Sequence, residues 1–295
     1  MNEPSTAGAV GFVGLGAMGS RMVRCLLERG RTVVAWNRTP STMPAQEGLE
    51  FAASPREVAE QTDVVLGCLR DDRAIDSVYR GPDGLLAGVH PRQLFMEHGT
   101  FSPSLAVALH VEAAALGAVF IDAPVTGGPE GAAAGTLAAM AGGGREEIAA
   151  RADLFSAYLA SISVVGPVGS GLRLKLVNQL LVSIHMAAAA EAAALLGSSG
   201  IDLADALPVL SAGWAASAML DRELPRSMRR DFQAAGATID GMVAVQHLVA
   251  GALREAGIES TVFADVRRLF QGAVAAGHAD DDPAALVAMY DRQQR

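Results

Sequence analysis

The sequence predicts an α/β protein in which a doubly wound, mainly parallel sheet is followed by a long helix and an all-helical C-terminal domain. Two observations support this class. Short apolar segments alternate with segments of helical spacing as far as residue 165, and buried strands that alternate with helices form mainly parallel sheets. Beyond Gly166 and Pro167 the alternation stops, and the remaining patterns are helical. We therefore expect two domains, residues 1–167 and 168–295.

The first strands and helices follow one another at short intervals. Residues 9–13 form an apolar strand, 20–29 have helical spacing, and 32–36 form a second buried strand. Ser54 and Glu57 have the spacing of a capping box, which predicts the start of a helix. The same criteria predict strands at 63–69, 94–97, 118–122, 137–141 and 161–165, and helices at 102–116 and 145–158.

Residues 169–197 predict one long helix. No proline interrupts the segment, and Leu, Ala and Met dominate it, so about 25 residues are expected to continue in one helix. It is apolar almost all round, which is typical of a buried helix. Its polar residues, among them Arg173, Lys175 and Glu191, argue against a membrane span. Shorter helices are predicted at 203–210, 239–255, 261–276 and 283–290.

Composition and charge exclude several classes of function. The 295 residues carry a net charge of -9, which argues against a general nucleic-acid binder and against an anionic membrane as partner. Cys25 and Cys68 lie in apolar segments and are expected to be core residues in a reducing compartment. The sequence has no Cys/His spacing for zinc and no EF-hand loop, so no metal is expected. The N-terminus lacks a basic segment followed by an apolar one, so the cytoplasm is the expected location.

A glycine-rich turn joins the first strand to the first helix, as the dinucleotide-binding Rossmann motif requires. In that motif the first glycine allows the tight turn, the second lets the backbone approach the pyrophosphate, and the third lets helix and strand pack closely. The phosphates are expected at the helix N-terminus, where free N–H groups and the helix dipole favour anions. The expected cofactor-binding turn consists of Gly14, Leu15, Gly16, Ala17, Met18 and Gly19.

The end of the second strand selects the cofactor. A site for NAD(H) is expected to carry an acid there, which accepts hydrogen bonds from the ribose 2′-hydroxyl. This chain has Asn37, Arg38 and Thr39 instead. Arg38 can pair with a 2′-phosphate, and its two polar neighbours can hydrogen-bond to that group. The sequence therefore predicts NADP(H) rather than NAD(H).

Three separated segments together resemble one family. Residues 12–22 (FVGLGAMGSRM) resemble the cofactor motif of the β-hydroxyacid dehydrogenases, the group that includes 3-hydroxyisobutyrate dehydrogenase, tartronate semialdehyde reductase and glyoxylate/succinic semialdehyde reductase. Residues 122–132 (DAPVTGGPEGA) look like its substrate-binding motif, and 169–179 (GSGLRLKLVNQ) look like its catalytic motif. The motifs match in order and spacing, and the resemblance extends from about residue 9 to residue 290.

The resemblance implies an oxidoreductase that interconverts a small carbonyl compound, a semialdehyde or keto acid, with its hydroxy acid by hydride transfer. By similarity Lys175 is the general acid and base. This role fits its chemistry, because an ammonium can protonate a carbonyl oxygen and partial desolvation lowers its pKa towards working pH. Asn178 would help to orient Lys175 and the substrate, and Gln179 would be a further substrate contact.

Further site positions follow from the family pattern. Thr100 matches a threonine that contacts the cofactor. In the family the strand that ends at Leu69 usually runs into Leu-Pro-Asp, whereas here Arg70 follows, which either adds a cofactor contact or points to solvent. His98, also at a strand end, is expected to be structural or a neighbour of the cofactor rather than a catalytic base. A glycine turn after a strand offers backbone N–H groups and a hydroxyl to a substrate carboxylate. That turn consists of Thr126, Gly127 and Gly128.

The C-terminal domain departs from the family pattern. Relatives carry a Lys-Asp pair at the start of a helix whose side chains reach the substrate and nicotinamide region, and alignment places Ala244 and Val245 there. The loss of both charges predicts a substrate that is larger, less polar or differently charged. A shift of one helical turn would bring in His247 instead. The family's use of its long helix implies a homodimer or homotetramer.

Two other functions stay open. Imine reductases have the same architecture, but they generally place another residue at the position of Lys175 and lack the DAPVTGG motif, while the apolar Ala244 and Val245 favour them. A catalytically idle NADP-binding protein, which senses the cofactor or holds a partner, is supported by the missing Lys-Asp pair alone. The retention of Lys175 with Asn178 argues against it, because a buried lysine without a use is costly.

Overall fold

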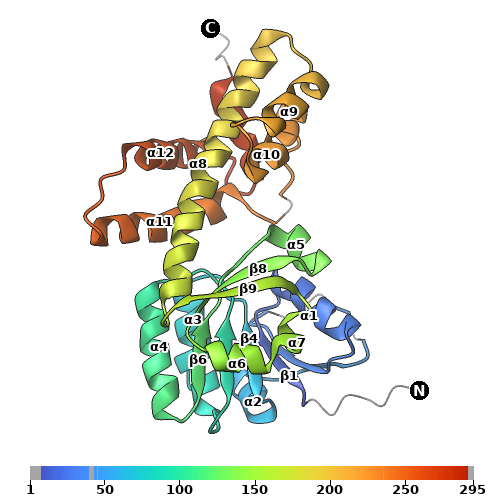
Figure 1. The fold of residues 1–295 in the computed structure, drawn as a ribbon, viewed down its shortest axis with the longest axis vertical. Coiled ribbons are helices and arrows are strands. Elements are labelled where there is room, and N and C mark those ends of the chain that lie inside the picture. The colour runs from blue at the N-terminus through green and yellow to red at the C-terminus, as the bar shows by residue number, and fades with distance from the viewer. Residues whose placement is uncertain (1–7, 40–42, 45, 235, 292–295) are drawn as a thin grey trace. The chain divides into compact units, whose positions relative to one another are not determined.

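The computed structural model describes residues 8–39, 43–44, 46–234 and 236–291. The chain forms two compact units, Met1–Lys175 and Leu176–Arg295. Helix α8 (Ser170–Ser199) begins in the first unit and continues into the second (Figure 1). The predicted sheet, long helix and all-helical C-terminal region are confirmed, whereas the predicted domain boundary at residue 167 stays a prediction.

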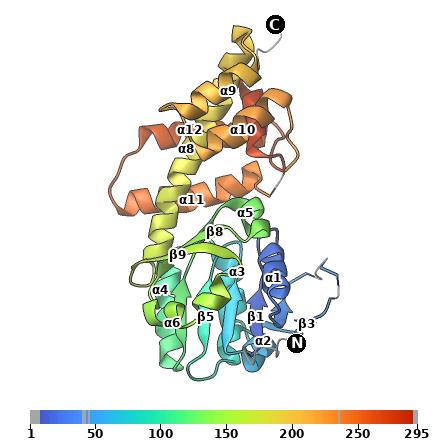
Figure 2. The ribbon, with the colours of Figure 1, turned by 45° about the vertical axis from the view of Figure 1, so that its right-hand side comes forward.

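Within the described residues, one nine-stranded sheet forms the centre of the first unit (Figure 2). The strand order is β3-β2-β1-β4-β5-β6-β8-β7, and β9 pairs with β8. All pairs from β3 to β6 are parallel, whereas β8 is antiparallel to both β6 and β7. The strands are β1 (Val10–Val13), β2 (Val33–Trp36), β3 (Leu49–Phe51), β4 (Val64–Gly67), β5 (Leu94–Glu97), β6 (Val119–Asp122), β7 (Val125–Thr126), β8 (Leu137–Gly142) and β9 (Leu159–Gly166).

Alternate strand residues pack against helices on the two faces of the sheet. Phe12, Leu66 and Met96 form one row across β1, β4 and β5 and pack with residues of α1, α5, α6 and α7. Val65 and Phe95 point to the other face, where α2, α3 and α4 cover them. These helices are α1 (Gly19–Glu28), α2 (Pro55–Gln61), α3 (Asp72–Arg80), α4 (Pro103–Ala115), α5 (Gly128–Ala134), α6 (Arg145–Ala150) and α7 (Ala152–Phe155), with a short 3₁₀ turn, η1 (Leu85–Ala87).

The start of α2 shows how a local sequence signal becomes structure. Ser54 Oγ accepts a hydrogen bond from the backbone N–H of Glu57 (3.2 Å), and Glu57 Oε2 accepts one from the backbone N–H of Ala53 (2.6 Å). Ser54 therefore satisfies an N–H group that the first turn of the helix leaves free, whereas Glu57 binds the N–H of the residue before the N-cap. The predicted N-cap at Ser54 is confirmed, but the return bond from Glu57 goes to Ala53 and not to Ser54 as in a capping box.

Several elements differ from the sequence-based expectation. β3, β7, α3, α5 and α10 were not predicted, because each is short or carries few apolar residues; α3, for example, buries only Ile75, Val78 and Tyr79. The helix predicted at 145–158 is two short helices, since the backbone leaves the helical conformation at Arg151, where φ is −124°. Residues 283–290 form a 3₁₀ rather than an α-helix.

The second unit is helical in all of its described parts that have regular structure. Arg222 pairs with Glu223 and, at 3.0 Å, with Asp282; both acids are 1% exposed or less. This buried ion cluster joins α10 to the final 3₁₀ segment. The elements that follow α8 are α9 (Leu203–Ala212), α10 (Ala218–Arg229), α11 (Ile239–Glu255), α12 (Thr261–Ala275) and η2 (Pro283–Tyr290).

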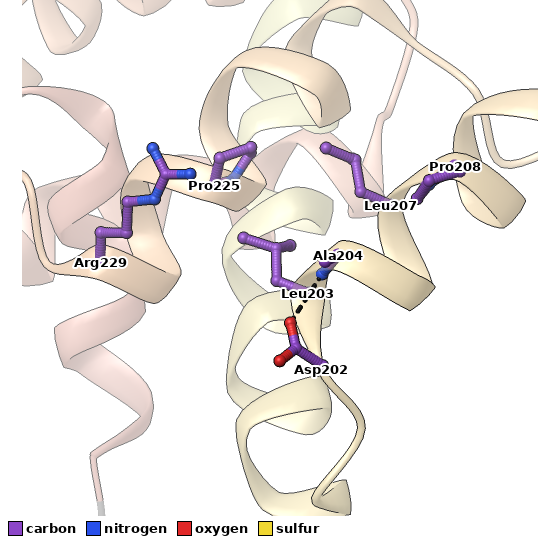
Figure 3. A pocket seen from close by; sticks show the side chains of 7 residues that line it. All are labelled: Asp202, Leu203, Ala204, Leu207, Pro208, Pro225 and Arg229. Atoms are coloured by element: carbon purple, nitrogen blue, oxygen red, sulfur yellow. Dashed lines mark hydrogen bonds between the residues drawn. The ribbon is translucent and has the colours of Figure 1, made fainter.

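By length and composition alone α8 would be able to cross a membrane, as would the core helices of many globular proteins. Three apolar clusters of the second unit include α8 side chains, for example Leu176, Met186 and Ala189. A cavity of about 350 Å³ lies beside α9 and α10 in the same unit (Figure 3). None of its lining residues is a predicted site residue: they are Asp202, Leu203, Ala204, Leu207, Pro208, Pro225 and Arg229.

Candidate active site

The carboxyl ends of the parallel strands bring most of the predicted cofactor residues to one edge of the sheet. Val13 pairs with Trp36 on one side and with Gly67 on the other, and Gly67 pairs with Glu97. Glu97 in turn pairs with Asp122. The loops that follow β1, β2, β4 and β5 therefore start at the same level, which is where open parallel sheets bind their ligands.

The three glycines of the β1–α1 turn differ in what surrounds them. Gly14 has φ = 94°, a left-handed conformation, and a Cβ there would lie 2.5 Å from the carbonyl oxygen of Cys68. A Cβ on Gly19 would lie 2.0 Å from the carbonyl oxygen of Gly14, so helix and strand meet closely at this point. A Cβ on Gly16 would meet nothing within 4 Å. The turn is thus closed at Gly14 and Gly19 and open at Gly16, which fits a bound pyrophosphate.

The N-terminus of α1 is free to meet an anion. Met18 stands at the capping position without a side-chain hydrogen bond, and the first turn holds no acid. Asn37, from the end of β2, accepts a hydrogen bond from the backbone N–H of Leu15 at 2.9 Å. Its amide nitrogen donates to the carbonyl oxygen and hydroxyl of Thr39 at 2.9 and 3.2 Å. Asn37 therefore shapes the turn, in addition to any contact with a ligand.

Two arginines act on one acid at this edge of the sheet. The pKa of Asp71 is lowered, first by the backbone N–H of Ala74, to which Asp71 gives an N-cap, and then by Arg70 and Arg38. Arg70 Nε lies 3.2 Å from Asp71 Oδ2, and both arginines are exposed. The loops after β2 and β4 thus each bring one guanidinium group towards Asp71. The sequence analysis named both arginines but missed the acid that links them.

Glu97 is a functional candidate that the sequence analysis missed. It is fully buried, and its Oε1 accepts hydrogen bonds from the backbone N–H groups of Leu69 (3.0 Å) and Gly99 (2.9 Å). A Cβ on Gly67 would lie 1.9 Å from Glu97 Oε2, so the carboxylate occupies the space that a side chain would need. Burial raises the pKa of Glu97 to about 7 against the effect of these hydrogen bonds. Glu97 ties the loop of Leu69 to the loop of Thr100.

His98 lies beneath the same edge and is 2% exposed. Its Nδ1 is 2.8 Å from the carbonyl oxygen of Ala123, which only accepts, so Nδ1 carries the proton. Its Nε2 is 2.9 Å from the hydroxyl of Tyr158 and therefore accepts from it. Burial lowers the pKa of His98 to about 4. A neutral imidazole with both nitrogens engaged supports the structural interpretation of His98.

The turn of residues 126–128 follows β7. Thr126 is half-buried and pairs with Ala138 of β8. Gly127 and Gly128 have φ values of 125° and 65°, so both occupy conformations that favour glycine. Helix α5 begins at Gly128. A Cβ on Gly128 would lie 3.0 Å from Glu130 Oε2. The turn is accessible, and its backbone N–H groups precede a helix.

Lys175 stands in the second turn of α8 and is 7% exposed. Burial lowers the pKa of its ammonium to about 8. Across the described parts of the chain, no acid lies within ion-pair distance of it. Further along the helix, in the second unit, the amide nitrogen of Asn178 donates to Gln179 Oε1 at 3.0 Å. A desolvated amine without a carboxylate partner is suited to proton transfer near neutral pH.

Asp122 is the second candidate that the sequence analysis missed, although it opens the 122–132 motif. It is fully buried at the end of β6. Its two oxygens accept hydrogen bonds from the backbone N–H groups of Gly169 (2.7 Å) and Leu172 (2.8 Å), at the start of α8. Burial raises its pKa to about 6. No local pattern announces this contact, because its partners lie far along the chain.

The described residues hold no group of three or more His, Cys, Asp or Glu side chains that is arranged for a metal ion. The geometry does fit a nicotinamide dinucleotide, because the turn is open at Gly16 and the start of α1 has no side-chain cap. The residues that would hold it in the first unit are the β1–α1 turn, the β2 end at 37–39, and the loops of Leu69 and Thr100.

Comparisons with known proteins agree with the geometry. Residues 9–166 match the NAD binding domain of 6-phosphogluconate dehydrogenase, and residues 169–290 match the NAD-binding domain of NADP-dependent 3-hydroxyisobutyrate dehydrogenase. L-Threonate dehydrogenase of Cupriavidus necator is 31% identical over 284 residues, which cover 95% of this chain and 95% of that protein. The chain belongs to the β-hydroxyacid dehydrogenase family. The resemblance seen in the three sequence motifs is confirmed.

Solved structures of several oxidoreductases are similar to this chain in fold. A 3-hydroxyisobutyrate dehydrogenase from Salmonella typhimurium has a TM-score of 0.84 at 26% identity and covers 96% of this chain and 99% of its own. Psf3, in complex with NADP⁺ and 2-OPP, has a TM-score of 0.84 at 26% identity, covering 95% and 99%. A reductive aminase from Aspergillus terreus shares the fold at a TM-score of 0.61 and 23% identity, covering 97% and 100%. Family membership supports an NAD(P)-dependent oxidoreductase that acts on CH–OH donors.

Proposed function

We propose that this β-hydroxyacid dehydrogenase uses NADPH to interconvert a small semialdehyde or keto acid with its hydroxy acid, with Lys175 as general acid and base. The observation that carries the proposal is the state of Lys175. It is the only lysine in 295 residues, all other members of the Lys/Arg class being arginine. Arginine cannot release its proton in a protein, whereas a buried lysine can. The one lysine thus stands where burial lowers its pKa to about 8.

The chemistry of Lys175 follows from that state. In the reducing direction its ammonium donates a proton to the carbonyl oxygen, and in the oxidising direction its neutral amine accepts the hydroxyl proton of the alcohol. The bound nicotinamide supplies or accepts the hydride. We assign to Asn178 the orientation of Lys175 and the substrate, and to Gln179 a substrate contact, since their amides are joined at 3.0 Å and act together.

The choice of NADP(H) is supported by charge at the edge of the sheet. Arg38 follows β2, where NAD-binding proteins carry an acid. Arg70, from the loop after β4, brings a second guanidinium group towards the same acid, Asp71. A 2′-phosphate gains charge-assisted hydrogen bonds from arginine that a 2′-hydroxyl does not. The NADP-dependence named in the C-terminal family model and the NADP⁺ bound to Psf3 point the same way.

A carboxylate on the substrate is supported by the turn of residues 126–128. Gly127 and Gly128 both have positive φ values, and successive backbone N–H groups in a turn of this kind can form an anion-binding concavity. The hydroxyl of Thr126 adds a donor. L-Threonate and 3-hydroxyisobutyrate, named for the relatives, both carry a carboxylate beside a hydroxyl. We therefore propose a hydroxy acid as the reduced substrate.

A substrate panel tests the proposal. The purified chain is assayed with NADPH and with NADH against small semialdehydes, keto acids and cyclic imines, and in reverse with hydroxy acids and NADP⁺, by the absorbance of the reduced nicotinamide. We expect turnover with a carbonyl acid and preference for NADPH. Binding of NADPH without turnover in any class would instead indicate a catalytically idle NADP-binding protein.

One observation favours imine reduction as a second candidate. Ala244 is exposed and Val245 is half-buried on α11, where the family pattern has a Lys-Asp pair. Apolar groups at this place suit a substrate without a carboxylate. Against it stand the unpaired Lys175 and the 126–128 turn, which match the hydroxyacid enzymes. Activity with cyclic imines and none with small carbonyl acids would reverse the order.

We also propose that the chain forms a homodimer or homotetramer. Helix α8 leaves large apolar side chains exposed on a single chain: Val177 is 56%, Leu181 48% and Leu195 71% exposed. Exposed apolar surface of this kind is typical of association surfaces. Burial of these side chains against a second copy of the chain would remove this apolar surface from water.

A further inference from the structure

The start of α8 lacks a cap of its own. The residue before the helix is Gly169, which has φ = 91° and no side chain with which to satisfy the free N–H groups of the first turn. Asp122 supplies two acceptors from a different element: Oδ1 accepts from the N–H of Gly169 at 2.7 Å, and Oδ2 accepts from that of Leu172 at 2.8 Å. The carboxylate thus caps a helix that begins 47 residues later in the chain.

The glycines around Asp122 allow this close contact. A Cβ on Gly171 would lie 2.1 Å from the carbonyl oxygen of Met140 and 3.0 Å from Asp122 Oδ2. A Cβ on Gly142 would lie 2.2 Å from Asp122 Oδ1. The first turn of α8 is therefore pressed against β6 and β8, and the carboxylate fits between two positions that only glycine can occupy.

This junction is continuous along the chain with both parts of the proposed substrate site in the first unit. Leu172 of α8 is fully buried against the sheet, and Lys175 follows it by three residues. Thr126 is four residues beyond Asp122, and β7, which contains it, is paired with β8 at Val125 and Ala139. The same carboxylate that holds the helix of Lys175 therefore also ends the strand that leads to the 126–128 turn.

We propose that Asp122 is a positioning residue that sets the place of the Lys175 ammonium relative to the 126–128 turn by pinning the first turn of α8 to the end of β6. The inference rests on the proposed function of Lys175. Asp122 makes no contact with substrate or cofactor in this role. It acts only through the backbone of α8, so its loss displaces Lys175 without removing it.

The single lysine provides a test that needs no substrate. Protein labelled with [ε-¹³C]lysine gives one side-chain signal, whose titration reports the Lys175 ammonium directly. In Asp122→Asn, one backbone N–H of α8 faces an amide donor instead of a carboxylate oxygen. We expect this substitution to change the chemical shift of the lysine signal and to shift the midpoint of its titration by roughly half a pH unit or more. Asp202→Asn is the matched control, because Asp202 caps α9 through the N–H of Ala204 (Figure 3) and belongs to no proposed site. An unchanged signal in Asp122→Asn, or an equal change in the control, would overturn the proposal.

Turnover separates positioning from general destabilisation. Asp122→Asn is expected to lower kcat about 10- to 100-fold, as a misplaced catalytic group does, with the Kd for NADPH changed less than twofold. In a Lys175→Ala background the same substitution should have little further effect, because the two residues act through one group. An equal fold-loss in both backgrounds would show that Asp122 does not act through Lys175.

The outcomes distinguish this inference from the proposed function. If Lys175→Ala keeps full turnover, the catalytic role of Lys175 fails, but the labelled-lysine titration still decides whether Asp122 positions that side chain. If Asp122→Asn does not fold, Gly171→Ala displaces the same turn by contact with the Met140 carbonyl and is measured in the same way. Loss of folding in both variants would overturn the proposal in favour of a purely structural role.

Discussion

Burial favours the uncharged form of four side chains near the edge of the sheet and shifts their pKa values accordingly. Lys175 is lowered to about 8 and His98 to about 4, while Glu97 is raised to about 7 and Asp122 to about 6. His98, Glu97 and Asp122 have hydrogen-bond partners and therefore structural roles. Lys175 has no acid beside it within the described chain, which is why it alone is assigned the proton transfer.

Substitutions of Lys175 test whether this side chain transfers the proton. Lys175→Ala is expected to lower kcat by about a hundredfold or more, the usual contribution of a general acid or base, with little change in the Kd for NADPH. Lys175→Arg is the matched variant, since it keeps the charge but cannot release a proton. Stopped-assay rates and NADPH fluorescence titration provide the two measurements. A Lys175→Arg enzyme with near-normal kcat would contradict proton transfer by this residue.

The pKa of Lys175 also predicts opposite pH profiles for the two directions. Reduction needs the ammonium, so kcat for the carbonyl acid should fall as pH rises through about 8. Oxidation needs the neutral amine, so kcat for the hydroxy acid should rise over the same range. Both profiles are measured between pH 6 and 10 at saturating substrate, where they report the enzyme–substrate complex. Parallel profiles in the two directions would not fit a shared acid and base.

Arg38 is expected to select the cofactor. Arg38→Ala should raise the KM for NADPH about tenfold or more through the loss of a charge-assisted hydrogen bond, with NADH nearly unaffected. Arg70→Ala provides the comparison, because Arg70 approaches the same acid from the next loop. Steady-state kinetics with both nucleotides give the ratio. An equal loss with NADPH and NADH would show that Arg38 does not read the 2′-phosphate.

At the scale of elements, Glu97 joins the loops that follow β4 and β5, but the burial of its charge lowers the stability of the fold. Its pKa rises from 4.5 to about 7 on folding. The folded chain therefore binds a proton that the unfolded chain has lost between these pH values, and this group destabilises the fold increasingly as pH rises from about 5 to about 7. Above pH 7 the penalty is complete, at roughly 3 kcal/mol or less.

Glu97→Gln tests this cost. A glutamine oxygen still accepts from the N–H groups of Leu69 and Gly99, while the buried charge is gone. Its free energy of unfolding relative to the natural chain should therefore increase between pH 5 and pH 8. His98 titrates in the opposite sense but is present in both proteins and cancels. Urea unfolding at several pH values gives the difference, and a difference independent of pH would refute the charge-burial argument.

The parts of the fold that the sequence predicted were those with local signals. The N-cap at Ser54, the glycine turn at 14–19 and the alternation of strands and helices each involve residues a few positions apart. Glu97 and Asp122 act through backbone N–H groups that lie 28, 47 and 50 residues away. No periodicity encodes such contacts. The glycines that make room for the two carboxylates, Gly67, Gly142 and Gly171, are the trace that these contacts leave in the sequence.

At the scale of the whole molecule, the exposed stripe on α8 is the feature that a single chain leaves unexplained. Val177 and Leu181 are four residues apart on the helix and about half exposed. We expect light scattering at micromolar concentration to give the mass of a dimer or tetramer. Val177→Glu with Leu181→Glu should shift the mass towards the monomer, while Val209→Glu, on α9, serves as a control with an apolar side chain 72% exposed. A monomeric natural chain would contradict the proposal.

The close fit of Gly67 against Glu97 has a consequence for how this enzyme can diverge. A side chain at position 67 and a glutamate at position 97 claim the same space, with a Cβ only 1.9 Å from a carboxylate oxygen. Position 67 therefore cannot gain a side chain while glutamate stands at 97, whereas position 97 can shorten while Gly67 stays. In lineages that place a larger residue at 67, the acid at 97 has to shorten first or at the same time. The two positions, 30 residues apart in the sequence, are therefore expected to change in that order.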